Sequence, residues 1–294
     1  MSQWTTADLL TTIKNRSMFP DASSGSLGTA TLLQFATEEL LITLMPLILS
    51  VREKYYETYA DTTITSATTS IAVPARASGG VLSSVQYIFN TDVRQMLPID
   101  PSTVTTTAGS SYPTNYYFQN NSIIPYPPPA STQGTVRIRY FQRPNRLEQT
   151  ANCAQITAFD ATTVTCAAVP STWAITNTVD FIPKTQSQAT PYGLDSAITG
   201  VSSNILTFTE TPTGVAIGDW VALSEYTPIP EVPFEFQAIL AQATACRGLE
   251  AIKDMAGLQN AQATLDKQII AATKLMTARD KGGTKKILSG WRRF

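Results

Sequence analysis

The residue types that most often carry out catalysis are scarce in this chain of 294 residues. Histidine is absent, which removes the usual general base, the histidine-dependent serine and cysteine triads, and the commonest zinc ligand. The three cysteines, Cys153, Cys166 and Cys246, lack CxxC spacing, and free cysteine is usually a buried apolar residue. The glycine pairs at 79–80 and 282–283 match no phosphate-binding loop pattern. We therefore predict no metal site, no redox centre and no cofactor site.

The carboxylates form no pair that suggests acid–base chemistry. Asp219 follows Gly218, a combination typical of a turn that leads into a strand. Glu231 and Glu235 lie one helical turn apart near a predicted helix start, where the helix dipole favours negative charge. An enzyme that uses carboxylates alone, such as a glycosidase, is an alternative, and it needs two acids about 5 to 9 Å apart across a cleft. The spacing indicates no such pair, so we predict no catalytic residue.

The C-terminal segment 282–294, called here the C-terminal arm, combines cations with apolar and aromatic side chains. From Arg279 onward the net charge is +5, whereas the rest of the chain carries −6. The acidic body lacks the clustered Lys and Arg that bind a phosphate backbone. Aromatic anchors are enriched at protein interfaces, so we expect the arm to dock in a protein pocket, with a solvated tail as the alternative. The candidate docking residues are Lys285, Lys286, Ile287, Leu288, Trp291, Arg292, Arg293 and Phe294.

Two helices are predicted at the N-terminal end. Thr5 and Asp8 form a capping-box pattern that starts a short first helix. Apolar residues three and four apart from Leu32 to Leu47 predict a longer second helix, kinked or restarted at Pro46. The apolar run 40–51 is far shorter than the ~20 residues that span a bilayer. We expect a core helix with no membrane contact, and the N-terminus shows no signal-peptide pattern.

After Tyr59 the composition changes to one rich in Thr, Ser and Val, which predicts a β region. Strands are expected at 62–64, 70–74, 82–89, 116–118, 122–124 and 135–141, with a hairpin turn at Asn120-Asn121 and loops at 100–114 and 125–133. In the last strand, alternation places Arg137 and Arg139 on the face opposite Val136 and Ile138. Together with Arg143, these arginines are candidates for a channel or subunit interface, and a solvated strand face is the alternative.

An internal repeat lies between about Ala151 and Tyr226. The pattern Ile156-Thr157-x-Phe159 and the residues that follow it return 42 residues later, starting at Ile198, with every spacing kept. Each unit reads as a hairpin followed by a third strand after a proline-bearing loop. Because a short hairpin is only marginally stable alone, the two units predict one inserted barrel or sandwich of about six strands.

The remaining sequence returns to helix. Three prolines in 227–233 predict a stiff, extended connection. An apolar stripe that begins at Phe236 and runs to Met276 then predicts a long helical stretch, which Gly248 and Gly257 allow to divide into two helices. We therefore predict an α+β fold with a helical core, a β region, an inserted β domain and an extended arm. The expected boundaries are 1–150 for the N-terminal helices plus β region, 151–226 for the insertion, 227–281 for the C-terminal helical segment and 282–294 for the arm.

The order of these features resembles that of a known family. The β region contains Leu82-Ser83-Ser84-Val85, and its last strand ends in Tyr140-Phe141-Gln142-Arg143-Pro144. After the insertion, Ile229-Pro230-x-x-Pro233 leads into an Ala-rich helix with a short basic tail. Taken together, this resembles the head-to-tail adaptor, or connector, proteins of tailed bacteriophages, especially the rings beneath the portal of short-tailed phages. The resemblance covers residues 1–150 and 225–294, whereas the insertion departs from the smaller members.

The resemblance implies a structural virion protein in the neck between capsid and tail, made in the host cytoplasm and without enzymatic activity. It implies a ring of twelve copies that joins the portal protein to tail nozzle or tail fibre proteins, around a channel through which genomic DNA passes without sequence recognition. In such a ring the helices form the core and the C-terminal arm docks on the portal, with Trp291 and Phe294 in apolar pockets. The β insertion projects towards fibres or nozzle.

A second class of function stays open from the residues themselves. A β-rich tail or capsid-decoration protein would bind host glycans through the insertion, and exposed aromatics such as Trp173 or Tyr192 would then matter more than the arm. Core packing is the alternative role for those aromatics, because large aromatics dominate protein cores.

Overall fold

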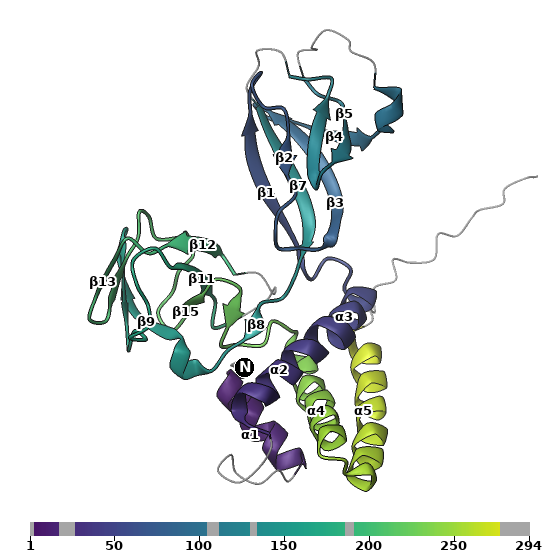
Figure 1. The fold of residues 1–294 in the computed structure, drawn as a ribbon, viewed down its shortest axis with the longest axis vertical. Coiled ribbons are helices and arrows are strands. Elements are labelled where there is room, and N and C mark those ends of the chain that lie inside the picture. The colour runs from purple at the N-terminus through teal and green to yellow at the C-terminus, as the bar shows by residue number, and fades with distance from the viewer. Residues whose placement is uncertain (1–2, 18–26, 105–111, 130–133, 186–190, 277–294) are drawn as a thin grey trace, which may run out of the picture.

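The chain folds into three lobes that meet at a short pair of parallel strands (Figure 1). The computed structural model describes residues 3–17, 27–104, 112–129, 134–185 and 191–276. A helical lobe, a sheet lobe and a small β-barrel surround the strands β8 (Arg146–Leu147) and β16 (Tyr226–Thr227), which pair in parallel. The predicted α+β class is confirmed, while the predicted domain boundaries stay predictions.

The helical lobe contains both N-terminal and C-terminal segments of the chain. Its elements are α1 (Thr6–Ser17), α2 (Thr29–Glu39), a π-helical turn η1 (Leu40–Leu44), α3 (Met45–Val51), α4 (Phe234–Ala251) and α5 (Met255–Met276). The capping box before α1 is confirmed, because the Thr5 amide donates to Asp8 Oδ2 at 2.9 Å and the Asp8 amide donates to Thr5 Oγ1 at 3.3 Å. One apolar cluster joins α1, α2, α3 and α4 through residues such as Leu9, Leu32, Ile48 and Phe236.

The predicted kink at Pro46 takes the form of the π-helical turn directly before it. Proline lacks an amide hydrogen and clashes with the carbonyl four residues earlier. The Met45 amide instead donates to the Leu40 carbonyl, five residues earlier, so the helix widens and continues. Among the described residues, the stretch Thr29–Val51 is long and apolar enough to cross a membrane, a test that core helices of soluble proteins also pass. Its inner face lies in the helical core.

The C-terminal helical stretch divides between the two glycines that the sequence marked. Lys253 adopts a positive φ of 63°, and the Asp254 side chain accepts the Gly257 amide at 3.0 Å as α5 begins. Helix α5 packs on the core through Leu265, Ile269 and Ala272. Most of its remaining side chains are exposed.

The sheet lobe is a seven-stranded sheet in the order β1-β7-β3-β4-β5-β6-β2. Its strands are β1 (Glu57–Ile64), β2 (Ile71–Ala72), β3 (Ala77–Phe89), β4 (Asp92–Pro98), β5 (Asn115–Gln119), β6 (Ser122–Tyr126) and β7 (Gly134–Gln142). The hairpin at Asn120-Asn121 is confirmed, since both residues have positive φ values of 49° and 57°. Strand β4 was missed, and the predicted loop 125–133 was wrong at its start, because Pro125 and Tyr126 belong to β6.

Both faces of strand β7 match the predicted alternation. Val136, Ile138 and Tyr140 are buried in the lobe's apolar cluster. Arg137 and Arg139 lie on the other face, partly exposed. The sheet therefore buries one face in its own core and leaves the face with the arginines open to solvent.

The inserted β domain is a nearly closed barrel. Its strands are β9 (Ala154–Phe159), β10 (Thr163–Cys166), β11 (Thr178–Ile182), β12 (Gly193–Ala197), β13 (Gly200–Ser202), β14 (Ile205–Thr207) and β15 (Trp220–Leu223). The order β12-β11-β15-β9-β10-β14-β13 begins and ends with two pieces of one interrupted strand, which brings the sheet round on itself. Counting β12 and β13 as one strand gives six, as the repeat predicted.

The two repeat units are related by an approximate twofold axis. Val164 pairs opposite Leu206, and Asp180 pairs opposite Ala222. Each of these pairs joins residues 42 positions apart, the period of the repeat. In an antiparallel pair, a residue lies opposite the equivalent residue of the other unit only when a twofold rotation exchanges the two units. The sequence repeat is therefore also a structural repeat.

Candidate assembly surfaces

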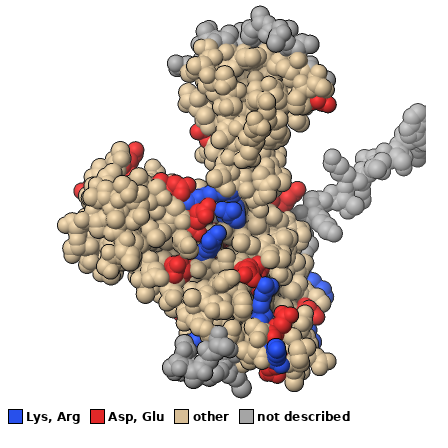
Figure 2. Space-filling model, in the orientation of Figure 1, with Lys and Arg blue, Asp and Glu red and all other residues tan. Residues whose placement is uncertain are grey.

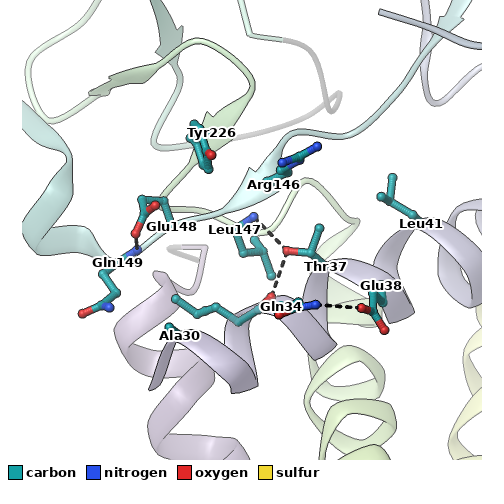
Figure 3. Close-up of a pocket in the computed structure, with 11 residues that line it drawn as sticks. Ala30, Gln34, Thr37, Glu38, Leu41, Arg146, Leu147, Glu148, Gln149 and Tyr226 are labelled. Atoms are coloured by element: carbon teal, nitrogen blue, oxygen red, sulfur yellow. Dashed lines mark hydrogen bonds between the residues drawn. The ribbon is translucent and has the colours of Figure 1, made fainter. Parts of the chain in front are cut away.

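A groove runs between α2 and strand β8, at the base of the barrel (Figure 3). It has a volume of about 490 Å³. The Leu147 amide donates to Thr37 Oγ1 at 3.1 Å and so ties the strand to the helix. Leu33 and Leu147 supply a buried apolar floor. The remaining lining residues are Ala30, Gln34, Thr37, Glu38, Leu41, Arg146, Glu148, Gln149 and Tyr226.

Both carboxylates that line the groove accept hydrogen bonds. Glu38 accepts a hydrogen bond from Arg247 at 2.6 Å, and Glu148 accepts from Asn152 at 2.9 Å. The exposed Arg146 guanidinium has no hydrogen bond or ion pair within the described parts of the chain. Arg146 and Leu41 also line a second, smaller cavity of about 110 Å³ beside Arg143. The groove thus combines an apolar floor with polar and charged side chains at its rim, a lining that suits a protein segment.

Charged side chains gather where the three lobes meet, as Figure 2 shows for one face of the molecule. At the centre of this region Arg76 is only 5% exposed. Its two terminal nitrogens contact the two Asp180 oxygens at 2.6 and 2.9 Å, and Nη2 also contacts Asp195 at 2.5 Å. Asn145 accepts from Arg76 at 3.2 Å and donates to Asp180 at 2.8 Å. These side chains form one connected network, in which Arg76, Asn145 and Asp180 are buried and Asp195 is exposed.

Glu231 extends this network to the start of α4. Its Oε2 accepts a hydrogen bond from the backbone amide of Asn145 at 2.8 Å, while Oε1 has no partner among the described residues. Burial, followed by the nearby Asp180 charge, raises the pKa of Glu231 to about 8, although the Asn145 amide and Arg76 oppose the shift. The dipole role predicted for this carboxylate was incomplete, because it did not foresee complete burial. Arg76, Asn145, Asp180, Asp195 and Glu231 are called the junction cluster below.

The three arginines named as candidates for a channel or interface lie on two different surfaces. Arg137 contacts Asp61 through two hydrogen bonds of 2.8 Å and lies 4.1 Å from the centre of the Tyr59 ring. Arg139 lies 5.9 Å from the same ring. Arg143 instead contacts Glu225 at 2.9 Å, near the junction of the lobes. Arg137 and Arg139 thus share one surface of the sheet lobe, and Arg143 belongs to another.

The other candidate residues have structural roles or lie beyond what is described. The C-terminal arm, with all eight predicted docking residues, lies outside the described residues. Cys153, Cys166 and Cys246 are buried and unpaired, and burial raises the pKa of Cys153 and Cys166 to about 12. No group of His, Cys, Asp and Glu suited to a metal ion occurs in the described residues.

Asp219 has the turn role predicted for it. Its Oδ2 accepts the Ala216 amide at 2.8 Å and the Tyr192 hydroxyl, and Oδ1 accepts the Lys184 amide at 2.9 Å. Trp173 is buried in the barrel core. The two aromatics considered for glycan binding are therefore engaged in the fold.

Large apolar side chains on the outside of α5 form a further surface. Met255, Ile270 and Leu275 are 67%, 55% and 65% exposed. Ala256, Gln259, Ala263 and other small or polar residues lie between them along the helix. These residues are spread along the exposed side of the helix and form no continuous apolar patch, so each of them alone is ordinary.

The sequence model of the SU10 adaptor protein family matches residues 4–171. This span takes in α1 to α3, the whole sheet lobe and the first hairpin of the barrel. The chain belongs to the SU10 adaptor protein family. It is thus a bacteriophage adaptor-type protein, a structural virion component of the head-to-tail junction. No match was found among curated proteins.

Proposed function

We propose that this protein forms an adaptor ring that joins the portal of a short-tailed phage to its tail and surrounds the path of the exiting DNA. The family match over residues 4–171 carries this proposal. The expected ring has twelve copies, and its partners are the portal protein above and tail nozzle or fibre proteins below. DNA passes without sequence recognition and the protein is no enzyme, in keeping with the family's structural role.

Helix α5 is the proposed contact between neighbouring copies. It is 22 residues long and packs on α4 along one side only. Its outward side combines exposed apolar residues with Ala, Gln and Lys, a composition that supports close packing against another helix. The barrel is the proposed contact for tail components, because Figure 1 shows it projecting away from the helical lobe.

The C-terminal arm is the proposed contact with the portal. It follows α5 in sequence, and its cations and two aromatics suit an acidic pocket with apolar floors. Deletion of 282–294 should leave a folded, soluble protein that no longer attaches to portal-containing heads. Normal attachment by the truncated protein would rule out this role for the arm.

Electron microscopy of the purified protein mixed with portal tests the ring itself. A ring coaxial with the portal is the expected result, and single copies or an unrelated arrangement would contradict the proposal. Ile270→Lys on α5 should prevent ring formation while circular dichroism stays unchanged. Ile217→Lys is the matched control, because Ile217 is 59% exposed on the barrel, close to the 55% of Ile270.

A further inference from the structure

The sheet lobe and the barrel each have an apolar core of their own. The buried cluster of the sheet lobe contains only residues from Ile64 to Tyr140. The buried cluster of the barrel contains only residues from Ala154 to Val221. Neither of these two cores contains side chains from the other lobe. A smaller apolar cluster packs Ile182 and Ala222 of the barrel against Ile229, in the connection to the helical lobe, but includes no residue of the sheet lobe. Among the described residues, these clusters therefore provide no apolar packing directly between the sheet lobe and the barrel.

Arg76 supplies ion pairs that join the two lobes directly. It precedes β3 in the sheet lobe, whereas Asp180 lies on β11 and Asp195 on β12 of the barrel. Two nitrogens of the guanidinium donate to the two oxygens of Asp180. This bidentate contact fixes the direction of the ion pair as well as its length. Backbone amides of Asp195 and Glu225 also donate to Asp180, at 3.0 and 3.1 Å. The Asp180 carboxylate is therefore held in one orientation.

The same network reaches the helical lobe. Asn145 lies between β7 and β8, bonds to both Arg76 and Asp180, and donates its amide to Glu231. Glu231 precedes α4, and its backbone carbonyl accepts the Tyr56 hydroxyl at 2.8 Å. One small cluster thus connects the sheet lobe, the barrel and the connection into the helical lobe.

The second repeat unit of the barrel shows which residue can occupy the position of Asp180. The equivalent position in the second repeat unit is Ala222, and the two residues lie opposite each other on β11 and β15. Both are completely buried. A strand of this barrel is therefore built with alanine at this position. The Asp180 carboxylate adds the contact with Arg76, besides accepting the Asp195 and Glu225 amides beside it.

We propose that the junction cluster is an orientation lock that holds the barrel at one angle to the sheet lobe. Burying an ion pair adds little net stability compared with apolar residues of similar size, and in some proteins it instead specifies one arrangement of the groups that carry it. The two-point contact between Arg76 and Asp180 has the directional geometry for such a role. Without the pair, each lobe keeps its fold and the angle between them varies. The lock sets where the barrel points, whatever partner the barrel contacts.

Distance measurements between spin labels test the lock in the full-length protein. Labels at Gln95→Cys on β4 and Ala158→Cys on β9 report on the two lobes, since both positions are exposed. The three native cysteines are buried, and a preparation without the added cysteines measures any labelling of them. The unaltered junction should give one narrow distance distribution. The variant Arg76→Met with Asp180→Leu should give a distribution at least twice as wide.

A matched variant separates the lock from a general loss of charge. Arg137→Gln with Asp61→Asn removes an ion pair that lies within the sheet lobe, and its distribution should stay narrow. If the lock variant is as narrow as the unaltered protein, the proposal is wrong. If the lock variant fails to fold by circular dichroism, Arg76→Lys decides, because it keeps the charge and loses the two-pronged contact. Broadening supports the lock, and a narrow distribution overturns it.

Discussion

The two halves of the barrel share their backbone geometry but differ in the side chains that meet the rest of the protein. Asn177 and Asp219 occupy equivalent positions and accept the amides of Ala174 and Ala216 at 2.7 and 2.8 Å. The residues before them, Thr176 and Gly218, have φ values of 86° and 93°. The repeat has therefore kept the turn that starts its third strand, even where the residue type changed.

The difference between the halves lies in what each one anchors. The first half carries Asp180, which contacts Arg76, where the second carries Ala222. The second half carries Asp219, whose Oδ1 accepts the Lys184 amide and whose Oδ2 accepts the Tyr192 hydroxyl in addition to the Ala216 amide. The two halves thus share a backbone geometry but differ in single side chains. Asp180 in the first half attaches the barrel to Arg76, and Asp219 in the second half supports the loop that contains Lys184.

The largest effect is expected from the core residues at the repeat's third strand. Phe181 is completely buried, whereas its equivalent Leu223 is only partly buried. Phe181→Ala should lower the free energy of unfolding by about 4 kcal/mol, and Leu223→Ala by about 2 kcal/mol, because the larger buried side chain leaves the larger cavity. Chemical denaturation measures both. Equal losses would show that the two halves contribute equally to the core.

A smaller loss in the free energy of unfolding is expected when Asp180 of the first half is replaced by alanine, the residue of the second half. Asp180→Ala leaves the Arg76 guanidinium buried with only Asp195 as a charged partner, and should lower the free energy of unfolding by about 3 kcal/mol. Asp61→Ala is the control, because it breaks the partly exposed pair with Arg137 and should cost less than about 1 kcal/mol. Thermal or chemical unfolding compares the two, and similar losses would contradict the importance of burial.

Asp180 in the first half is linked to Glu231 through Asn145, whose side chain donates to Asp180 and whose backbone amide donates to Glu231. Burial raises the pKa of this carboxyl from 4.5 to about 8. Between these values the folded protein keeps a proton that the unfolded chain releases, so the free energy of unfolding falls as pH rises. The slope should approach about 1 kcal/mol per pH unit. Glu231→Gln should flatten it in denaturation experiments from pH 5 to pH 8, and an unchanged slope would assign the effect elsewhere.

The smallest effect is expected where the halves differ in backbone strain. A β-branched residue at positive φ is strained, and glycine is not. Thr176→Gly should raise the free energy of unfolding by about 1 kcal/mol. Gly218→Ala should lower it by a similar or larger amount, because the new Cβ would lie 3.0 Å from the Lys184 side chain. A loss from Thr176→Gly would mean that the threonine side chain makes a compensating contact.

Periodicity and spacing were enough to predict the parts of the fold that depend on local pattern. The 42-residue repeat predicted the barrel because its buried residues recur in pairs, such as Ile156 with Ile198 and Val164 with Leu206. The pairing across the twofold axis did not follow from spacing, since it depends on contacts between the units. Strand β4 was missed because only Met96 in it is buried, so it shows no alternation.

The junction cluster is the part of the molecule that could not be predicted from the sequence. Arg76, Asn145, Asp180 and Glu231 come from four distant segments and share no motif. Burial at 0% distinguishes Asp180 and Glu231 from ordinary surface acids, and only the fold reveals it. Of the arginines considered from the sequence, Arg137 and Arg139 lie on β7, away from the junction, and only the fold shows that Arg143, just after β7, lies beside Arg76 and Asn145.

Closure of the barrel affects how many copies of the protein can lie close together without aggregating. Free strand edges readily pair with other chains, and proteins protect them with charge or by closing the sheet. The barrel brings its first and last strands together as pieces of one strand, while the eight-residue edge strand β1 of the sheet lobe carries Glu57 and Asp61. Many barrels can therefore be held side by side at high local concentration with little tendency to join edge to edge into aggregates.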